Sequence, residues 1–126
     1  MIKIFLLMIL CHILDDFVFQ PVCLSKMKQK TWWKEHIFNE RDNELYKNDH
    51  IAALVVHSIS WSIMINLPLF FLYIPDILLL ISVILNAIVH FVVDDFKANK
   101  KKINLCFDQS IHFIQILFTF LFFFSI

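Results

Sequence analysis

The chain has 126 residues, of which 60% are hydrophobic and 15 are phenylalanine, a composition outside the range of soluble globular domains. Basic and acidic residues both number 11, so no overall charge favours nucleic acid as a partner, and the complete absence of glycine excludes a nucleotide held by a glycine-rich phosphate loop. The sequence therefore predicts one integral membrane domain over residues 1–126, of the all-α class, folded as a four-helix transmembrane bundle.

The first predicted helix covers about residues 2–20 and is ended by Pro21. His12, Asp16 and Gln20 succeed one another at four-residue spacing and share one helix face, while Asp15 lies about 60° to the side. Ionisable residues inside the run, and the lack of a small-residue cleavage site after it, indicate a mature transmembrane helix instead of a signal peptide.

Residues 21–50 form the only long polar segment, predicted as a polar loop. Six basic and five acidic side chains alternate there around Trp32 and Trp33. Two interpretations are open. A tryptophan pair beside charges suits a segment at the headgroup level of a membrane, and the same composition suits a solvated loop with one or two short helices.

Three further apolar runs are predicted as helices over about residues 51–73, 77–96 and 104–125. Each is long enough to cross a hydrocarbon core, which needs about 20 residues. The loops before the first of them and after the second are rich in lysine, whereas the turn at Pro75 has none. The positive-inside rule then predicts a multi-pass protein of the inner membrane, with the basic loops in the cytoplasm and both termini outside.

Polar side chains in the last two runs recur at helical spacing. His90 precedes Asp94 by four residues, and Asp108 precedes His112 by four, so each pair stays on one helix face. The same faces extend to Asn86, Lys97, Gln115 and Thr119. An ionisable group at the bilayer centre costs roughly 2.5–3.5 kcal/mol on insertion scales, so these faces are expected to turn toward protein.

The predicted topology places four histidines, one from each helix, at a common membrane depth, with five aspartates about one turn nearer the cytoplasm. The histidines are His12, His57, His90 and His112. The aspartates are Asp15, Asp16, Asp94, Asp95 and Asp108. We expect the two sets to converge in one interior cluster.

Imidazole nitrogens and carboxylate oxygens are suitable ligands for zinc, and also for manganese or iron. The predicted cofactor is a divalent metal ion, with zinc as the first candidate. The predicted ligands are His12, His57, His90 and His112, and the candidate catalytic residues are Asp16, Asp94 and Asp108, acting as ligand or general base. Supporting roles are assigned to Asp15, Gln20, Asp95, Lys97 and Gln109. Replacing His90 or His112 by Ala is expected to remove the metal, whereas replacing Ser60 is expected to leave it in place.

Two interpretations without a functional site remain. Asp108 could cap the N-terminus of the last helix, where the helix dipole favours an anion, although aspartates near helix C-termini gain nothing in that way. The polar residues could also form an interhelical hydrogen-bond network that only holds the bundle together. The three cysteines, Cys11, Cys23 and Cys106, have no CxxC spacing and are expected to be reduced, with the second and third on the cytoplasmic side and the first inside the membrane.

Three segments around these residues, 12–20, 90–97 and 107–112, together with His57 and the lysines at 26 and 28, resemble the ordered motifs of domain-of-unknown-function family 3307, a family of small bacterial and phage membrane proteins. The resemblance covers nearly the whole chain. It implies a membrane location and a polar constellation, and no activity. The family pattern often has a second histidine one turn before His57, where this chain has Ala53. A more distant likeness to membrane-bound hydrolases is by analogy alone.

Two classes of function fit these features. The first is a metal-dependent membrane hydrolase acting on a lipid or headgroup near the cytoplasmic leaflet. The second is non-enzymatic: a small transporter of metal ions or protons, or a phage-type effector that acts on a host membrane protein. The expected partners are membrane lipids, with a second copy of the chain or a host protein as alternatives, and no nucleic acid. Few polar residues continue into the outer halves of the helices, which argues against a continuous transport pathway through one monomer.

Overall fold

The structure, a computed structural model, describes residues 1–37 and 39–125, and every regular element in those ranges is a helix. The all-α class is therefore confirmed. Three long helices form most of the fold: α5 (Asp49–Asn66), α6 (Asp76–Ala98) and α7 (Leu105–Phe124). Helix α1 (Ile2–Ile13) continues as a π-helix, η1 (Leu14–Phe19), and α5 continues as a 3-10 helix, η2 (Leu67–Phe71).

The segment predicted as a polar loop is largely helical. It contains three short helices: α2 (Val22–Met27), α3 (Lys30–His36) and α4 (Glu40–Tyr46). Trp33 stacks on Tyr46 with ring centroids 5.8 Å apart, so α3 and α4 are held against each other by aromatic contact.

Three helical stretches in the described part of the chain are long and apolar enough to cross a membrane: Glu40–Phe71, Asp76–Ala98 and Leu105–Phe124. They correspond to the last three predicted helices, with ends that differ by a few residues or, for the first, begin earlier at Glu40. The first predicted helix, formed by α1 and η1, is not among them, and it carries the charged residues Lys3, Asp15 and Asp16. A fourth crossing is therefore part of the proposal made below.

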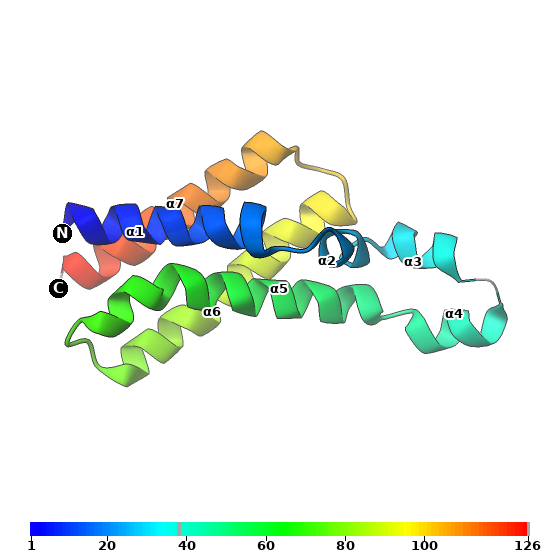
Figure 1. Cartoon of the computed structure of the whole chain (residues 1–126), viewed down its shortest axis with the longest axis horizontal. Helices are drawn as coiled ribbons and strands as arrows, with labels where there is room; N and C mark the ends of the chain where they lie inside the picture. The colour runs from blue at the N-terminus through cyan, green and yellow to red at the C-terminus, as the bar shows by residue number, and fades with distance from the viewer. Residues whose placement is uncertain (38, 126) are drawn as a thin grey trace.

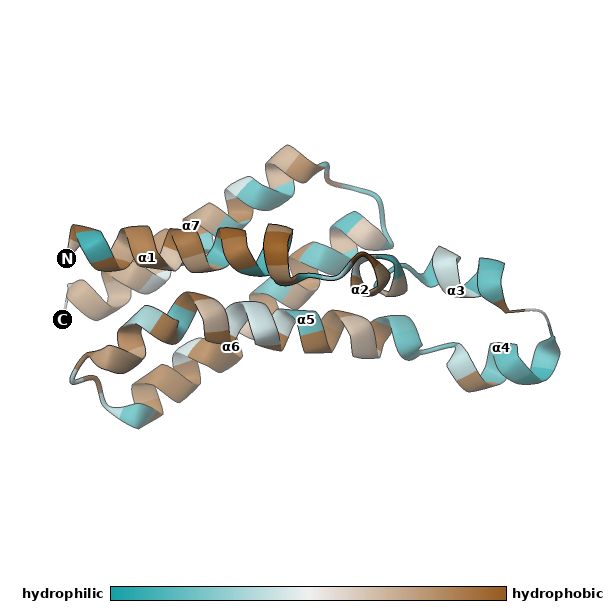
Figure 2. Cartoon of the chain, viewed as in Figure 1, coloured by the Kyte–Doolittle hydropathy of each residue, from teal (hydrophilic) through white to brown (hydrophobic). Residues whose placement is uncertain are grey.

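The long helices pack lengthwise (Figure 1). Helices α5 and α6 form an antiparallel pair joined by a short turn, and α1 lies along α5 and α7. Both termini and the turn between α5 and α6 lie at one end of the bundle, while α2, α3 and α4 lie at the other (Figure 1). Hydrophilic residues concentrate at that second end and in bands within α5, α6 and α7 (Figure 2).

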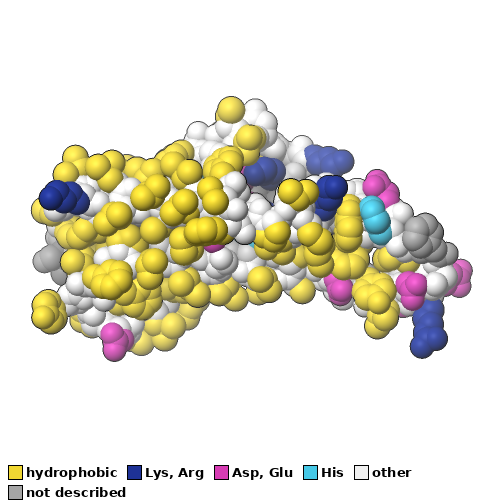
Figure 3. Space-filling view, in the orientation of Figure 1, with side chains coloured by type: hydrophobic (Ala, Val, Ile, Leu, Met, Phe, Trp, Pro, Cys, Tyr) yellow, Lys and Arg dark blue, Asp and Glu magenta, His cyan; other side chains and the backbone are white. Residues whose placement is uncertain are grey.

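The exterior of the bundle is apolar and much of its interior is polar. Large hydrophobic side chains such as Leu80, Ile84 and Phe118 are exposed, and they cover the half of the molecule around the termini (Figure 3). Buried side chains include His12, Asp15, His57, Asn66, Asp94 and His112. A continuous apolar exterior of this kind marks a surface that faces lipid or a partner.

Two layers fill the half of the bundle nearest the termini. An apolar cluster holds Met8, Trp61, Ile65, Leu69, Leu79 and Ile116. Beside it, Ser82 Oγ donates to Asn66 Oδ1 at 2.7 Å, and Gln115 Nε2 donates to Asn86 Oδ1 at 2.8 Å. Asn86 Nδ2 in turn donates to Thr119 Oγ1 at 3.0 Å, which joins α6 to α7. These polar side chains form an interhelical network, so the structural interpretation holds for this half of the bundle.

The start of α7 is capped by Asn104, whose side-chain oxygen accepts a hydrogen bond from the Phe107 backbone N–H at 2.9 Å. Asp108 lies in the first turn of α7, where the helix dipole favours an anion, but the side chain that caps the helix is Asn104. Just before the cap, Lys101 adopts a positive φ of 52°. This left-handed conformation costs a residue with a Cβ roughly 1–2 kcal/mol. Glycine would avoid that cost, but the chain contains none.

Candidate functional site

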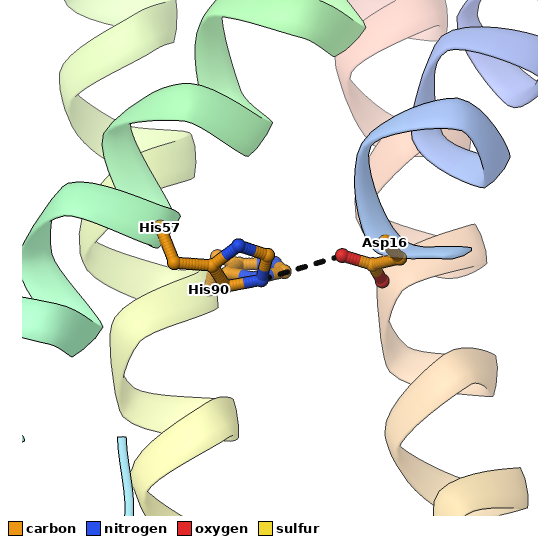
Figure 4. Close-up of side chains that lie close together, drawn as sticks. All are labelled: Asp16, His57 and His90. Atoms are coloured by element: carbon orange, nitrogen blue, oxygen red, sulfur yellow. Dashed lines mark ion pairs between the residues drawn. The ribbon is translucent and has the colours of Figure 1, made fainter. Parts of the chain in front are cut away.

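Helices α5, α6 and α7 and the π-helix η1 bring histidines and aspartates together in the bundle interior. His57 on α5 reaches η1, with its Nε2 atom 3.3 Å from Asp16 Oδ1 and its Nδ1 atom 3.7 Å from Asp15 Oδ2. In Figure 4 the His57 ring and the His90 ring lie together on one side, and Asp16 points toward them from the other. Residues 33 to 74 positions apart in the sequence thus share one site.

Asp94 lies between three imidazole rings. One of its oxygens, Oδ2, is 3.6 Å from His57 Nε2 and 3.8 Å from His90 Nε2. The other oxygen, Oδ1, is 3.8 Å from His112 Nε2. The rings of His90 and His112 stack on each other with centroids 4.1 Å apart, and His112 Nε2 also lies 3.4 Å from Asp108 Oδ1.

Two overlapping groups of residues in the described chain could hold a metal ion. They are Asp16, His57 and His90, and His90, Asp94 and His112, and within each group the ligand atoms lie within 4.8 Å of one another. Ligand atoms about 2.0–2.1 Å from a tetrahedral zinc ion are separated by roughly 3.3 Å. The separations between imidazole nitrogens and carboxylate oxygens in the cluster, from 3.3 to 3.8 Å, are close to that edge length.

Several buried ligand atoms in the cluster lack a hydrogen-bond partner among the described residues. They are His90 Nε2, His112 Nε2, Asp16 Oδ1 and Asp108 Oδ1. A buried polar atom left unsatisfied costs about 1–3 kcal/mol, and more when it is charged. Asp16 and His90 belong to one ligand group and His90 and His112 to the other, so a cation bound by either group would satisfy some of these atoms.

The charges in the cluster do not balance. Asp15, Asp16, Asp94 and Asp108 are four buried or nearly buried carboxylates, and two lysines reach them. Lys28 Nζ donates to Asp94 Oδ2 at 2.6 Å, and Lys97 Nζ donates to Asp108 Oδ2 at 2.6 Å. With neutral imidazoles, four carboxylates against two ammonium groups leave a formal charge of minus two. One divalent cation would neutralise it.

His12 has surroundings of another kind. Its Nδ1 atom accepts a hydrogen bond from Trp61 Nε1–H at 2.8 Å. An indole N–H can only donate, so Nδ1 carries the lone pair and a neutral His12 ring bears its proton on Nε2. His12 lies beside Asp16, but neither of the two ligand groups includes it. The bond to Trp61 favours a donor role for His12 over the predicted role of metal ligand.

The predicted supporting residues divide into two sets. Gln109 Nε2 donates to Asp16 Oδ2 at 3.3 Å and to Asp108 Oδ2 at 3.1 Å, so it bridges two carboxylates of the cluster. Lys97 bonds Asp108, as given above, and Asp15 accepts a hydrogen bond from Ser60 Oγ at 2.7 Å. Ser60 therefore touches the cluster, so it is a poor choice for a variant expected to leave the metal in place.

Asp95 and Gln20 lie toward the edge. Asp95 accepts from Asn99 Nδ2 at 2.9 Å and pairs with Lys100 at 3.2 Å, so it is directed toward the loop after α6 and away from the histidines. Gln20 follows η1 in an extended conformation, so the predicted helical face from His12 ends before it. Its Nε2 atom is buried without a partner among the described residues.

Sequence reasoning missed two contacts of the cluster. Lys28 was named in the sequence only as part of the family resemblance, without a contact to the cluster, and its ion pair with Asp94 spans 66 positions. Trp61 was not singled out, although it lies four residues after His57 and so on the same face of α5. Its ring stacks on His90 with centroids 4.2 Å apart. Cys11 is buried, whereas Cys23 and Cys106 are exposed, and none of the three belongs to a ligand group.

Comparison with known proteins agrees with the motifs found in the sequence. Residues 4–126 match the family described as "Protein of unknown function (DUF3307)". Searches of curated proteins and of solved structures found no match. Since the family match covers nearly the entire chain and includes every residue of the cluster, this protein belongs to the DUF3307 family.

Proposed function

We propose that this protein is a membrane-embedded, metal-dependent hydrolase that acts on a lipid or its headgroup. One divalent transition ion, with zinc as the first candidate, would be held by His57, His90, His112 and Asp94, with Asp16 or Asp108 completing the set. The observation that carries this proposal is the convergence of buried imidazole and carboxylate atoms that lack hydrogen-bond partners among the described residues, in a cluster whose formal charge is minus two when its imidazoles are neutral.

The roles of the residues follow from their contacts. A bound zinc ion would supply a Lewis acid that acidifies water and polarises an ester oxygen. Asp16 and Asp108 are the candidates for the general base, because each has one oxygen held by Gln109 and another without a partner. His12 bears its proton on Nε2, which is buried without a hydrogen-bond partner among the described residues and is therefore free to donate to a bound group, whereas the His12 atom beside Asp16 is Nδ1.

The location of the cluster supports a substrate from the membrane. The three long helices could each span a bilayer, and the site is in contact with Lys28 and Lys97 of the lysine-rich segments. In the proposed topology α1 and η1 provide a fourth crossing, the lysine-rich segments lie in the cytoplasm and the termini lie outside the inner membrane. A site at that depth would meet headgroups of the cytoplasmic leaflet.

Metal content is the decisive measurement. Protein purified in mild detergent, without chelator and with an affinity tag that contains no histidine, is expected to carry about one zinc ion per chain. His90→Ala and His112→Ala should lower that content strongly. His36→Ala is the matched control, since His36 is exposed and stacks on Trp32 outside the bundle, and it should retain the metal.

A second control is Ser110→Ala, two residues before His112 on α7. Ser110 Oγ donates only to the Cys106 carbonyl oxygen, at 2.8 Å, and replaces Ser60 as a control because Ser60 touches Asp15. Metal content unchanged in both histidine variants would refute the proposed metal site. A folded protein without metal would instead favour the non-enzymatic class, in which the cluster holds the bundle together or binds a partner. If metal is present, hydrolysis of lipid-like esters is the next assay.

A further inference from the structure

The end of the cluster nearest the short helices opens into a polar cavity of about 270 Å³. Asp16, His57 and Asp94 form its inner wall, so the cavity leads directly to the proposed metal ligands. A second cavity of about 220 Å³ adjoins it and shares Lys28, Lys97 and Asp94. The cluster is therefore connected to a space large enough for a small polar group.

The remaining walls of this cavity are rich in hydrogen-bond donors. Lys28 and Lys97 line it, and each ammonium group already bonds one carboxylate of the cluster. Gln20 lines it as well, with a buried Nε2 atom that has no partner among the described residues, and Ser25 adds a hydroxyl. Two ammonium groups, an amide and a hydroxyl around one space fit an anion with several acceptor oxygens, and phosphate is such an anion.

The rim of the cavity is apolar. Phe17 on η1 and Leu105 on α7 both line it, and their side chains are 59% and 52% exposed on the outer surface of the bundle. A polar group inside the cavity would therefore be continuous with hydrocarbon outside. That combination matches an amphipathic molecule, with its head in the cavity and its acyl chain against Phe17 and Leu105.

We propose that this cavity binds the phosphate group of a phospholipid, and that this binding is coupled to the metal ion. The proposal rests on the proposed function, since it names the substrate class of the same site. Without metal and with neutral imidazoles the cluster carries a formal charge of minus two, so a phosphate placed beside Asp16 and Asp94 is repelled. With a divalent cation the cluster is neutral. The ammonium groups of Lys28 and Lys97 each have three N–H donors, so each can donate to its carboxylate and to the phosphate.

The coupling is measured by titration calorimetry in maltoside micelles, with protein either loaded with zinc and freed of excess ion or stripped with chelator. The probes are dioctanoyl phosphatidic acid, inorganic phosphate and dioctanoylglycerol. We expect phosphatidic acid to bind at least about tenfold more tightly to the zinc-loaded protein, within the usual range for coupled sites. Inorganic phosphate should compete with it weakly, since it lacks the acyl contacts, and dioctanoylglycerol should not compete.

Variants locate the binding in the cavity. Lys97→Gln, compared at equal zinc loading, should weaken phosphatidic acid binding roughly tenfold, as expected for one charged hydrogen bond. Lys100→Gln is the matched control, because Lys100 pairs with Asp95 away from both cavities. Gln20→Leu provides a second test that breaks no existing contact of that amide nitrogen, and it should also weaken binding.

The outcomes separate the two proposals. Zinc-loaded protein that binds no phosphatidic acid, or binds it equally with and without zinc, overturns the coupled phosphate site and leaves the metal centre intact. Equal affinity for inorganic phosphate and for the lipid overturns the lipid assignment. Undiminished binding in both Lys97→Gln and Gln20→Leu places the phosphate elsewhere and also refutes the inference. A protein that takes up no zinc refutes the metal centre and the coupling together.

Discussion

Asp94 and Asp95 are adjacent in sequence and face different surroundings. Asp94 touches three imidazole rings and Lys28, whereas Asp95 bonds Asn99 and Lys100 at the end of α6. Neighbouring residues on an α-helix point about 100° apart, so two adjacent carboxylates cannot share one face. The helical period predicted Asp94 at the cluster correctly, and it also shows why the predicted supporting role of Asp95 has no geometric basis in the structure.

This pair provides a matched test of the metal centre. Asp94→Asn keeps the shape of the side chain and removes its charge. Loss of a residue that only supports a metal ligand typically lowers metal affinity by about 10- to 100-fold, so loss of Asp94 itself should lower zinc affinity by about 100-fold. Asp95→Asn should bind zinc as the unmodified protein does. Both affinities can be measured by competition with a fluorescent zinc chelator. Equal zinc affinity in the two variants would contradict the assignment of Asp94.

Lys28 is buried against Asp94, so its removal should destabilise the metal-free protein. Lys28→Gln leaves a buried carboxylate without its cation, a loss of roughly 3–5 kcal/mol in the free energy of unfolding for pairs of this kind. Zinc should restore much of the loss, because the ion then neutralises Asp94. Thermal unfolding in detergent, with chelator and with zinc, measures both effects. Lys26→Gln, an exposed lysine on α2, is the control, and an unfolding temperature of Lys28→Gln equal to that of this control in chelator would be inconsistent with the buried pair.

Local periodicity accounts for which residues could be predicted at this scale. His90 with Asp94, and Asp108 with His112, are related within one helix, and the 3.6-residue period places each pair. The contacts of Lys28 and Trp61 with the cluster join residues 66 and 49 positions apart. No helical period relates such residues, so these contacts required the three-dimensional fold.

At the scale of elements, the π-helix η1 is the main departure from expectation. The sequence predicted one regular helix over about residues 2–20, and the structure changes to π geometry at Leu14. Within η1 Asp15 contacts Ser60 and Asp16 contacts His57, so both carboxylates reach α5 although they are adjacent. π segments inside helices are often found at functional sites, and this one lies at the cluster. The apolar run of the sequence contains no signal that distinguishes α from π geometry.

At the start of α7, Asn104 caps the helix and Asp108 belongs to the cluster, so the two roles can be tested separately. Asn104→Ala removes the N-cap hydrogen bond to Phe107, so the free energy of unfolding should fall by about 1 kcal/mol, while zinc content stays the same. Asp108→Asn leaves the cap intact and removes a candidate ligand or base, so zinc affinity or hydrolysis should fall. Unfolding curves and metal analysis of the two variants distinguish the roles. Loss of zinc in Asn104→Ala with no loss in Asp108→Asn would contradict this division.

At the scale of the whole molecule, the long apolar runs were sufficient to predict the helices that could cross a membrane, because length and hydropathy alone determine that property. The helices within residues 21–50 were harder to predict from the sequence. Charges alternate there without a clear apolar period, and the three short helices depend on contacts such as the one between Trp33 and Tyr46. The number of crossings depends on α1 and η1. The buried Asp15 and the partly buried Asp16 make this segment less apolar, and both belong to the site.

The cysteines test this topology. With four crossings and the lysine-rich segments in the cytoplasm, the exposed Cys23 and Cys106 should resist an impermeant thiol reagent in intact cells and react once the membrane is permeabilised, whereas the buried Cys11 should react in neither case. Tyr73→Cys supplies the opposite control, since Tyr73 is fully exposed in the turn between α5 and α6 at the far end of the bundle and should react in intact cells. Mass spectrometry of the labelled peptides resolves each position. Labelling of Cys23 and Cys106 in intact cells, with Tyr73→Cys protected, would invert the orientation and move the site to the outer leaflet. Labelling of Cys23 with Cys106 protected would instead place the two lysine-rich segments on opposite sides, which four crossings cannot produce.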